Sequence, residues 1–399
     1  MNRRNNNRRY GGGSSPRRRP QPSRKYSGKR TIDISRYINA NIESLEPVLY
    51  IPKHTFKDFP VGDALKANIA TKGYTIPTPI QDQIIPQILQ GLDVVGVANT
   101  GTGKTAAFLI PLIHKAQTNS KQQILIVTPT RELALQINEE LGSFIKNMRM
   151  YSTCAVGGAP INRQIADLKR LNNFVIGTPG RIKDLIKRRV LDLSKFETIV
   201  LDEADRMLDM GFIKDMRYLV DQMPYVRQTL FFSATISREI EGLISEFLKD
   251  PIRISVKIGE TAKNIHQDVV RIQRSSTKID TLHDLLKDKD FDKVLVFGRT
   301  KHGVQKISNA LTKRGFSSTA IHGNKSQSQR QKALKDFKSN RTRVLVATDV
   351  AARGLDIPDV SHVINFDIPA TYDDYVHRIG RTGRIDKKGK ALTFIEPGA

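Results

Sequence analysis

Short runs of apolar residues recur along the chain, and small or polar residues follow each run. In the first half the runs are Val94–Ala98, Ile124–Thr128, Phe174–Gly177, Ile199–Leu201 and Leu230–Phe232. In the second half they are Val294–Phe297, Thr319–Ile321, Val344–Ala347, Val363–Phe366 and Leu392–Ile395. Continuous apolar runs of this length are typical of strands buried on both faces of a parallel sheet.

Longer amphipathic stretches separate these runs, for example Thr130–Ile145, Ile161–Leu171 and Val304–Leu311. Alternation of strand and helix indicates an α/β protein with helices on both faces of a parallel sheet. Because the pattern restarts after residues 250–265, we predict two such domains, spanning 83–253 and 264–399. In open sheets of this type, ligands bind at the carboxyl ends of the strands.

A third pattern precedes the first domain, where Ile34, Ile38, Ile42 and Leu45 recur at helical spacing before Pro47. This spacing predicts a short docking helix within a linker of residues 31–53. We expect the helix to pack on the first domain.

The charge is unevenly distributed along the 399 residues. The chain has 65 Lys and Arg against 40 Asp and Glu, a net charge of +25. Eleven of the basic residues fall within residues 1–30, which contain no acidic residue, so the rest of the chain is basic as well. Such a composition cannot offset its ordering entropy by burial, and we predict a disordered Arg-rich arm over residues 1–30 that attracts polyanions. A solubilising or targeting tail is the alternative.

Cysteine content and hydropathy exclude several classes of protein. Cys154 is the one cysteine, so an internal disulfide and a four-cysteine zinc site are both impossible. The N-terminus has no apolar signal-peptide core, and no run approaches the roughly 18 apolar residues of a membrane span. We therefore expect no membrane partner and a reducing compartment.

The first apolar run leads into a glycine-containing loop and then into a helix-compatible stretch. Strand, glycine loop and helix together place backbone N–H groups and a lysine around phosphates. The predicted nucleotide-binding residues of this loop are Ala98, Asn99, Thr100, Gly101, Thr102, Gly103, Lys104 and Thr105. Ala98 stands where the general phosphate-loop pattern has its first glycine. A simple glycine-rich turn is the alternative.

A second motif, Thr198-Ile-Val-Leu-Asp202-Glu203, again delivers polar groups at the end of an apolar strand. Asp202, with the Thr105 hydroxyl, is predicted to hold Mg²⁺, and Glu203 to orient or deprotonate the attacking water. Paired acids after a strand also occur as a helix N-cap. The lysine of the phosphate loop makes a nucleotide hydrolase the preferred interpretation.

The sequence Asp202-Glu-Ala-Asp205 is the one after which the DEAD-box RNA helicases of superfamily 2 are named, and the chain resembles that family over residues 54–399. The resemblance implies two tandem RecA-like domains. Residues 54–82 resemble the family's adenine-reading segment, which contains Phe56 and Gly73–Gln81. It implies that Gln81 hydrogen-bonds adenine and Tyr74 stacks on it, which would select ATP over GTP.

Further motifs occur in the family's order in both halves of the chain. By resemblance, the contacts with the RNA backbone are Pro129, Thr130, Arg131, Gly158, Thr178, Gly180, Arg181, Arg330 and Thr348. Ser233 and Thr235 resemble the hydroxyl pair that links nucleotide state to strand separation, through Asp202, Asp205 and His377. Asp356 would meet the ribose of ATP.

Three arginines, Arg378, Arg381 and Arg384, are spaced three residues apart. On a helix this spacing would keep them within about 120 degrees of one face, where they could converge on one anion. By resemblance, Arg381 and Arg384 are arginine fingers that complete the ATP site. With Lys104, Asp202 and Glu203 they make up the predicted catalytic set.

These features together predict an ATP-dependent RNA helicase that uses ATP and Mg²⁺ and locally unwinds short duplexes without reading their sequence. Single strands, short duplexes and ribonucleoprotein particles are the expected partners of a monomeric protein. We expect it in the cytoplasm, or also in the nucleus of a eukaryote. An ATP-gated RNA clamp and a DNA translocase are the alternatives.

Overall fold

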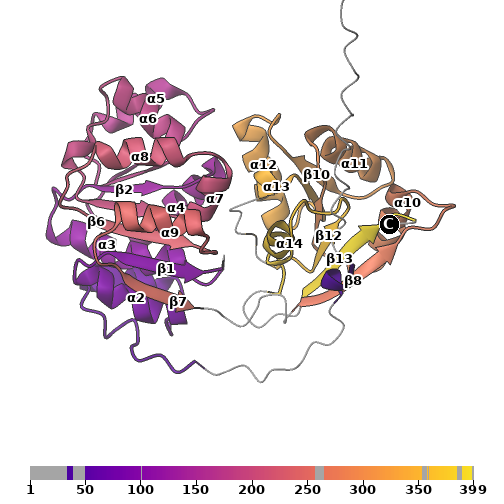
Figure 1. Cartoon of the computed structure of the whole chain (residues 1–399), viewed down its shortest axis with the longest axis horizontal. Helices are drawn as coiled ribbons and strands as arrows, with labels where there is room; N and C mark the ends of the chain where they lie inside the picture. Colours follow the sequence, from indigo (N-terminus) through magenta and orange to yellow (C-terminus); the bar gives the residue numbers. More distant parts are fainter. Residues whose placement is uncertain are drawn as a thin grey trace, which may run out of the picture. The chain divides into compact units, whose positions relative to one another are not determined.

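A computed structural model describes residues 34–38, 50–99, 101–256, 265–352, 357, 359–383 and 389–397. The strands of this part of the chain form two sheets, each flanked by helices (Figure 1). The predicted arm, residues 1–30, lies outside the described residues. The α/β class with two parallel sheets is confirmed.

The first sheet has the strand order β3-β4-β2-β5-β6-β1-β7, and all neighbours are parallel. Its strands are β1 (Val94–Ala98), β2 (Ile124–Val127), β3 (Ser152–Ala155), β4 (Phe174–Gly177), β5 (Thr198–Leu201), β6 (Gln228–Ser233) and β7 (Ile252–Val256). Its helices are α1 (Asp63–Thr71), α2 (Pro79–Leu89), α3 (Lys104–Thr118), α4 (Arg131–Phe144), α5 (Ile161–Leu168), α6 (Pro179–Lys187), α7 (Ala204–Asp209), α8 (Ile213–Asp221) and α9 (Arg238–Phe247), with a 3₁₀ turn η2 (Leu193–Lys195).

Alternation along the strands divides the buried residues of this sheet into two cores. Ile124 and Ile126 of β2 pack with residues of α1, α2, α3 and α4. Leu125 and Val127 of the same strand pack with residues of α6, α7, α8 and α9. Because successive side chains of a strand point to opposite faces, a run without polar interruption buries both faces of the sheet.

The second sheet has the order β10-β11-β9-β12-β13-β8, again with all neighbours parallel. Its strands are β8 (Ile265–Arg271), β9 (Val294–Phe297), β10 (Ser318–Ile321), β11 (Val344–Ala347), β12 (His362–Asn365) and β13 (Gly389–Ile395). Its helices are α10 (Lys278–Leu286), α11 (Lys301–Lys313), α12 (Gln327–Lys338), α13 (Asp349–Ala352) and α14 (Tyr372–Ile379).

The segment predicted to join the domains contributes to both sheets instead. β7 lies within residues 250–265 and pairs with β1, and β8 begins at Ile265 and pairs with β13. The residues between them, 257–264, lie outside the described part. The join near residues 250–265 was predicted, but β7 and β8 on either side of it were not, because edge strands need not have continuous apolar runs.

The N-terminal docking helix is also placed differently from the prediction. Ile34–Tyr37 forms a 3₁₀ turn, η1, that contacts β8 of the second sheet. The buried ring of Tyr37 meets Tyr375 edge-to-face, with the ring centroids 4.7 Å apart. The expected packing on the first domain is therefore wrong for this turn. Residues 39–45 of the predicted helix lie outside the described residues.

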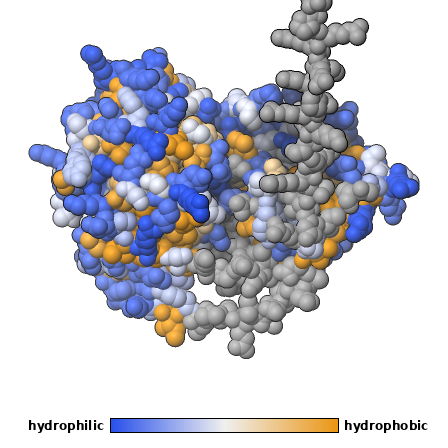
Figure 2. Space-filling view, in the orientation of Figure 1, coloured by the Kyte–Doolittle hydropathy of each residue, from blue (hydrophilic) through white to orange (hydrophobic). Residues whose placement is uncertain are grey.

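The helices are short relative to a bilayer. Among the described residues, none is both long and apolar enough to cross a membrane. On the face shown in Figure 2, hydrophilic side chains are intermixed with scattered hydrophobic areas.

Candidate functional site

The strand order of the first sheet brings three sequence-predicted motifs together. β5, β6 and β1 are consecutive neighbours, and each is followed at its carboxyl end by one motif. The phosphate loop follows β1, the acidic motif from Asp202 follows β5, and Ser233 ends β6. A ligand at this edge of the sheet would meet all three motifs, although about 100 residues separate the first from the second along the chain.

The phosphate loop is held in shape by its own polar groups. Gly101 and Gly103 have φ values of 84° and 94°, in the left-handed region that favours glycine. Lys104 begins α3, and its buried Nζ donates to Ala98 O at 2.7 Å. Thr102 Oγ1 donates to Asn99 O. The ammonium group is thus held at the start of the loop, and it would exchange this carbonyl for phosphate oxygens on nucleotide binding. Thr100 lies outside the described residues.

Gln81 lies in the first turn of α2 and contacts the phosphate loop directly. Its Nε2 donates to Gly103 O at 3.1 Å, and its Oε1 accepts from Thr78 N at 2.9 Å. Thr78 Oγ1 in turn donates to Thr102 O at 2.8 Å. A Cβ on Gly103 would lie 2.5 Å from Gln81 Nε2, so glycine is needed for this approach. Both ends of the Gln81 amide are therefore occupied, and its contact with adenine stays a prediction.

Tyr74 belongs to an aromatic cluster rather than to the phosphate loop. Its ring stacks on Phe144 with centroids 5.8 Å apart, and Phe56 meets it edge-on at 5.7 Å. Tyr74 Oη donates to Glu140. One face of the ring is covered by Phe144, so the predicted stacking on adenine would have to use the other face.

Asp202 is buried at the end of β5. Burial raises its pKa to about 6, a rise opposed by Lys104 and reinforced by Glu203. Its Oδ1 accepts from Glu203 N at 3.0 Å. A buried carboxylate with a raised pKa lacks compensating positive charge, and Mg²⁺ would supply that charge. Among the described residues no cluster of three or more His, Cys, Asp or Glu could hold a metal.

Glu203 has a strained backbone and a buried partner. Its φ of 54° is unusual for a residue with a side chain. Its Oε2 pairs with Arg206 Nη1 at 3.0 Å, and the two side chains are only 5% and 2% exposed. The sequence prediction did not include Arg206, although its position three residues after Glu203 would have indicated the pair.

Asp205 joins the acidic motif to the end of β6. Its Oδ2 accepts from Ala234 N and Thr235 N, both at 3.1 Å, and from Thr235 Oγ1 at 3.3 Å. Ser233 Oγ donates to Thr235 O at 2.6 Å. The described contacts thus link Asp205 directly with Thr235, and with Ser233 only through Thr235. The further links from this motif to Asp202 and His377 stay predictions.

The predicted RNA contacts of the first domain lie along the other half of the same sheet edge, where β3, β4 and β2 are neighbours. Pro129, Thr130 and Arg131 follow β2, Gly158 follows β3, and Thr178, Gly180 and Arg181 follow β4. The Arg131 guanidinium lies against Gly158, where a Cβ would come within 2.2 Å of Nη1. Arg181 Nη1 donates to Gln164 Oε1 at 2.8 Å. Sequence-distant residues are therefore assembled on one edge, and their contact with RNA stays a prediction.

Two predicted RNA-binding residues lie in the second domain. Thr348 directly follows β11, and Arg330 lies on α12 after β10. Arg330 Nη2 pairs with the buried Glu132 at 2.6 Å, and Gln327 Nε2 donates to the same carboxylate at 3.3 Å. An RNA contact by Arg330 through this nitrogen would require the ion pair to open. Glu132 lies inside the predicted Pro129–Leu133 motif, but the sequence prediction gave it no role.

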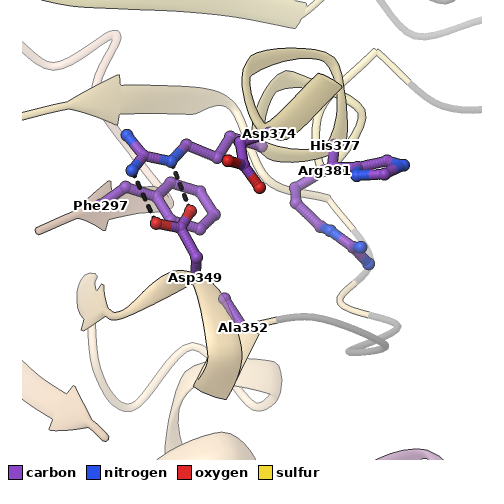
Figure 3. A pocket seen from close by; sticks show the side chains of 7 residues that line it. Phe297, Asp349, Ala352, Asp374, His377 and Arg381 are labelled. Atoms are coloured by element: carbon purple, nitrogen blue, oxygen red, sulfur yellow. Dashed lines mark hydrogen bonds and ion pairs between the residues drawn. The ribbon is translucent and has the colours of Figure 1, made fainter. Parts of the chain in front are cut away.

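The arginine motif after β12 is arranged differently from the prediction. A pocket is lined by Phe297, Asp349, Ala352, Asp374, His377, Arg378 and Arg381 (Figure 3). Arg378 is buried and makes two bonds to Asp349, Nε–Oδ1 at 2.5 Å and Nη2–Oδ2 at 2.8 Å, while its Nη1 donates to Asn365 and to Asp367 O. Figure 3 shows His377 and Arg381 extending away from this pair.

The prediction that three arginines share one helical face was therefore wrong. α14 ends at Ile379, so Arg381 lies beyond the helix, and Arg378 is used inside the second domain. Gly380 and Gly383 are poor helix formers, which explains the early end. Arg384 and Asp356 lie outside the described residues, and the catalytic role of Arg381 stays a prediction.

Comparisons with known proteins agree with this arrangement. The family profile described as DEAD/DEAH box helicase matches residues 78–243, and that described as helicase conserved C-terminal domain matches residues 277–386. The chain is 47% identical over 345 residues to the DEAD-box ATP-dependent RNA helicase CshA of Bacillus cereus. The aligned region covers 86% of this chain and 66% of CshA. Against the CshA proteins of Bacillus, the chain spans 64 to 66% of the relative's length.

Solved structures show the same relationship. A DEAD box protein from the hyperthermophile Methanococcus jannaschii is 41% identical, with a TM-score of 0.52, and the match covers 87% of this chain and 94% of that protein. S. cerevisiae Dbp5 bound to RNA and ADP BeF3 is 28% identical, with a TM-score of 0.77 and coverage of 86% and 90%.

Proposed function

Because the chain belongs to the DEAD/DEAH box helicase family, we propose that it binds and hydrolyses ATP to separate short RNA duplexes locally. The observation that carries the proposal is the adjacency of β1, β5 and β6, whose carboxyl ends bring Lys104, Asp202, Glu203 and Ser233 to one edge. The relatives named above as ATP-dependent RNA helicase and as bound to RNA support the substrate class.

In the proposed reaction, different groups of the chain bind the triphosphate, orient the attacking water and stabilise the developing negative charge. The backbone N–H groups at the start of α3 and the Lys104 ammonium bind the triphosphate and neutralise part of its charge. Glu203 orients the attacking water and accepts its proton, while Arg206 holds the glutamate in place. Arg381 supplies further positive charge to the developing oxyanion.

Mg²⁺ belongs to the same proposal. Asp202 and the Thr105 hydroxyl would hold the ion, because Asp202 directly follows β5 and Thr105 lies in the first turn of α3, beside the phosphate loop at the same edge of the sheet. When bound, Mg²⁺ supplies charge neutralisation of the phosphate oxygens. The loss of Lys104 and the loss of Asp202 should therefore both weaken nucleotide binding.

We propose that RNA binds along the ends of β3, β4 and β2 through sugar and phosphate groups. Hydroxyls, glycines and arginines at these positions suit backbone contacts and read no base sequence. β5, which carries Asp202 and Glu203 of the ATP site, lies beside β2, so the proposed RNA and ATP sites are adjacent. The proposal also includes ribonucleoprotein particles as partners and a monomeric state. It further includes a cytoplasmic location, because a chain with a single cysteine suits a reducing compartment.

Hydrolysis measured with and without RNA tests the proposal. Wild-type protein should hydrolyse ATP, RNA should stimulate it, and a DNA strand of the same sequence should stimulate it much less. Lys104→Ala and Glu203→Gln should each reduce turnover by roughly 100-fold or more while the fold is kept. Equal stimulation by DNA would favour the DNA translocase, and one strand-displacement event per protein would favour the clamp.

A further inference from the structure

A buried carboxylate next to Gln81 has no role in the site described so far. Asp82 lies in the first turn of α2 and is 2% exposed. Its Oδ2 accepts from Tyr50 Oη at 2.5 Å and from Lys53 N at 2.8 Å. Its Oδ1 lies 3.1 Å from His54 N and 2.7 Å from His54 Nδ1. One carboxylate thus gathers groups from residues 28 to 32 positions upstream.

These bonds fasten a segment that has no strand or helix of its own. Residues 50–62 form only turns and irregular backbone, so their position must come from side-chain contacts. His54 packs on Phe59 with ring centroids 5.4 Å apart, and Phe56 lies edge-on to Phe59 and to Tyr74. The segment therefore has an apolar attachment through Phe56 and Phe59 and a polar attachment at Asp82.

Gln81, the residue before Asp82, connects α2 to the phosphate loop instead. Gln81 donates to Gly103 O of the phosphate loop, and Thr78 donates to Thr102 O. Successive residues of an α-helix point about 100 degrees apart, so a single turn connects the phosphate loop on one side with residues 50–54 on the other. A shift of this turn would displace the Gln81 amide from the loop.

We propose that Asp82 is a positioning residue for nucleotide recognition. Its carboxylate fixes residues 50–54 to the first turn of α2 and thereby sets the place of Gln81 beside the phosphate loop before nucleotide binds. The inference rests on the proposed function, in which this site binds ATP. It adds that discrimination between ATP and other nucleotides depends on a carboxylate that does not itself contact the nucleotide.

Asp82→Asn tests the proposal, since asparagine keeps the size but loses the charge that strengthens all four bonds. We expect the KM for ATP to rise about tenfold, the preference for ATP over GTP to fall by a similar factor, and kcat to change less than about twofold. Tyr50→Phe removes one donor and should raise the KM about two- to threefold.

Asp93→Asn is the matched control. Asp93 is another buried carboxylate of the first domain, and it accepts from Thr229 N and Lys249 N at 2.7 and 2.8 Å. It precedes β1, at the end of the sheet away from the phosphate loop. Asp93→Asn should lower the melting temperature without changing the KM or the ATP preference.

A folded Asp82→Asn protein with wild-type KM and preference would overturn the proposal. So would an Asp93→Asn protein with an equal change in KM, because the effect would then be one of stability alone. Binding of a fluorescent ATP analogue distinguishes a failure of the Asp82 proposal from a failure of the proposed function. If the wild type binds the analogue but hydrolyses no ATP, the proposed function fails, and the ratio of Kd values between wild type and Asp82→Asn still tests Asp82. If the wild type does not bind it, both fail.

Discussion

The buried pair of Glu203 and Arg206 makes a quantitative prediction about the centre of the site. Replacing Arg206 by Met keeps most of the side-chain volume but leaves the Glu203 carboxylate buried without its cation. The pair is 3.0 Å apart and at most 5% exposed, so water cannot take over the role of Arg206. Breaking such a pair from one side costs about 3–5 kcal/mol of the free energy of unfolding.

The second single variant, Glu203→Gln, costs less because the amide oxygen still accepts a hydrogen bond from Arg206. We expect Glu203→Gln to lower the free energy of unfolding by about 2 kcal/mol. In the double variant, neither of the two substituted side chains carries a buried charge. We expect the double variant to lose about 3 kcal/mol of the free energy of unfolding. The pair should then show a coupling free energy of about 3 kcal/mol, within the range of contacting residues.

Native-state hydrogen exchange of peptides from β5 and β6 measures these free energies in the first domain alone. Arg217→Met is a suitable control, since Arg217 and Glu246 form an exposed ion pair, and its loss should leave the free energy of unfolding nearly unchanged. Additive losses from Glu203→Gln and Arg206→Met, within about 0.5 kcal/mol, would refute the assignment of Arg206 as the partner that holds Glu203.

Two further predictions concern acid stability and the N-terminal arm. His362 is 3% exposed and stacks on Phe291, and burial, with Lys390 nearby, lowers its pKa to about 4. Between its ordinary pKa near 6.5 and this value, the unfolded chain binds a proton that the folded chain does not. Stability should therefore fall by about 3 kcal/mol as the pH drops from 6.5 to 4. His362→Phe should flatten that loss in urea titrations of the second domain, and an unchanged pH slope would contradict it. Deleting residues 1–30 should reduce the slope of RNA affinity against salt by about 0.7 for each phosphate the arm contacts, and an equal slope in the truncated protein would exclude a polyanion-binding arm.

Strands and the ends of strands could be predicted because their signals are local. β1, β4, β9 and β11 consist of four or five consecutive apolar or small residues, and the structure has the predicted bounds for all four. β3 was not predicted, since Ser152–Ala155 contains two hydroxyl residues and a cysteine. β7 and β8 lie at sheet edges and carry polar residues on their exposed positions, so their apolar runs are broken.

The candidate site divides in the same way. Lys104, Asp202 and Asp205 could be found because each follows a recognisable strand within a known spacing. Arg378 could not, because its role depends on Asp349 and Asn365, which come close only after folding. Asp82 likewise forms hydrogen bonds with residues about 30 positions away, and the periodicity of the sequence does not predict such contacts.

In the proposed function, ATP and RNA bind one coupled site, built on neighbouring strand ends of the first sheet. Equilibrium RNA affinity, measured with and without a non-hydrolysable ATP analogue, tests it most directly. We predict that the analogue tightens RNA binding at least about tenfold, that RNA tightens binding of the analogue by the same factor, and that Lys104→Ala removes both effects. An RNA affinity that is the same with and without the analogue would contradict the account.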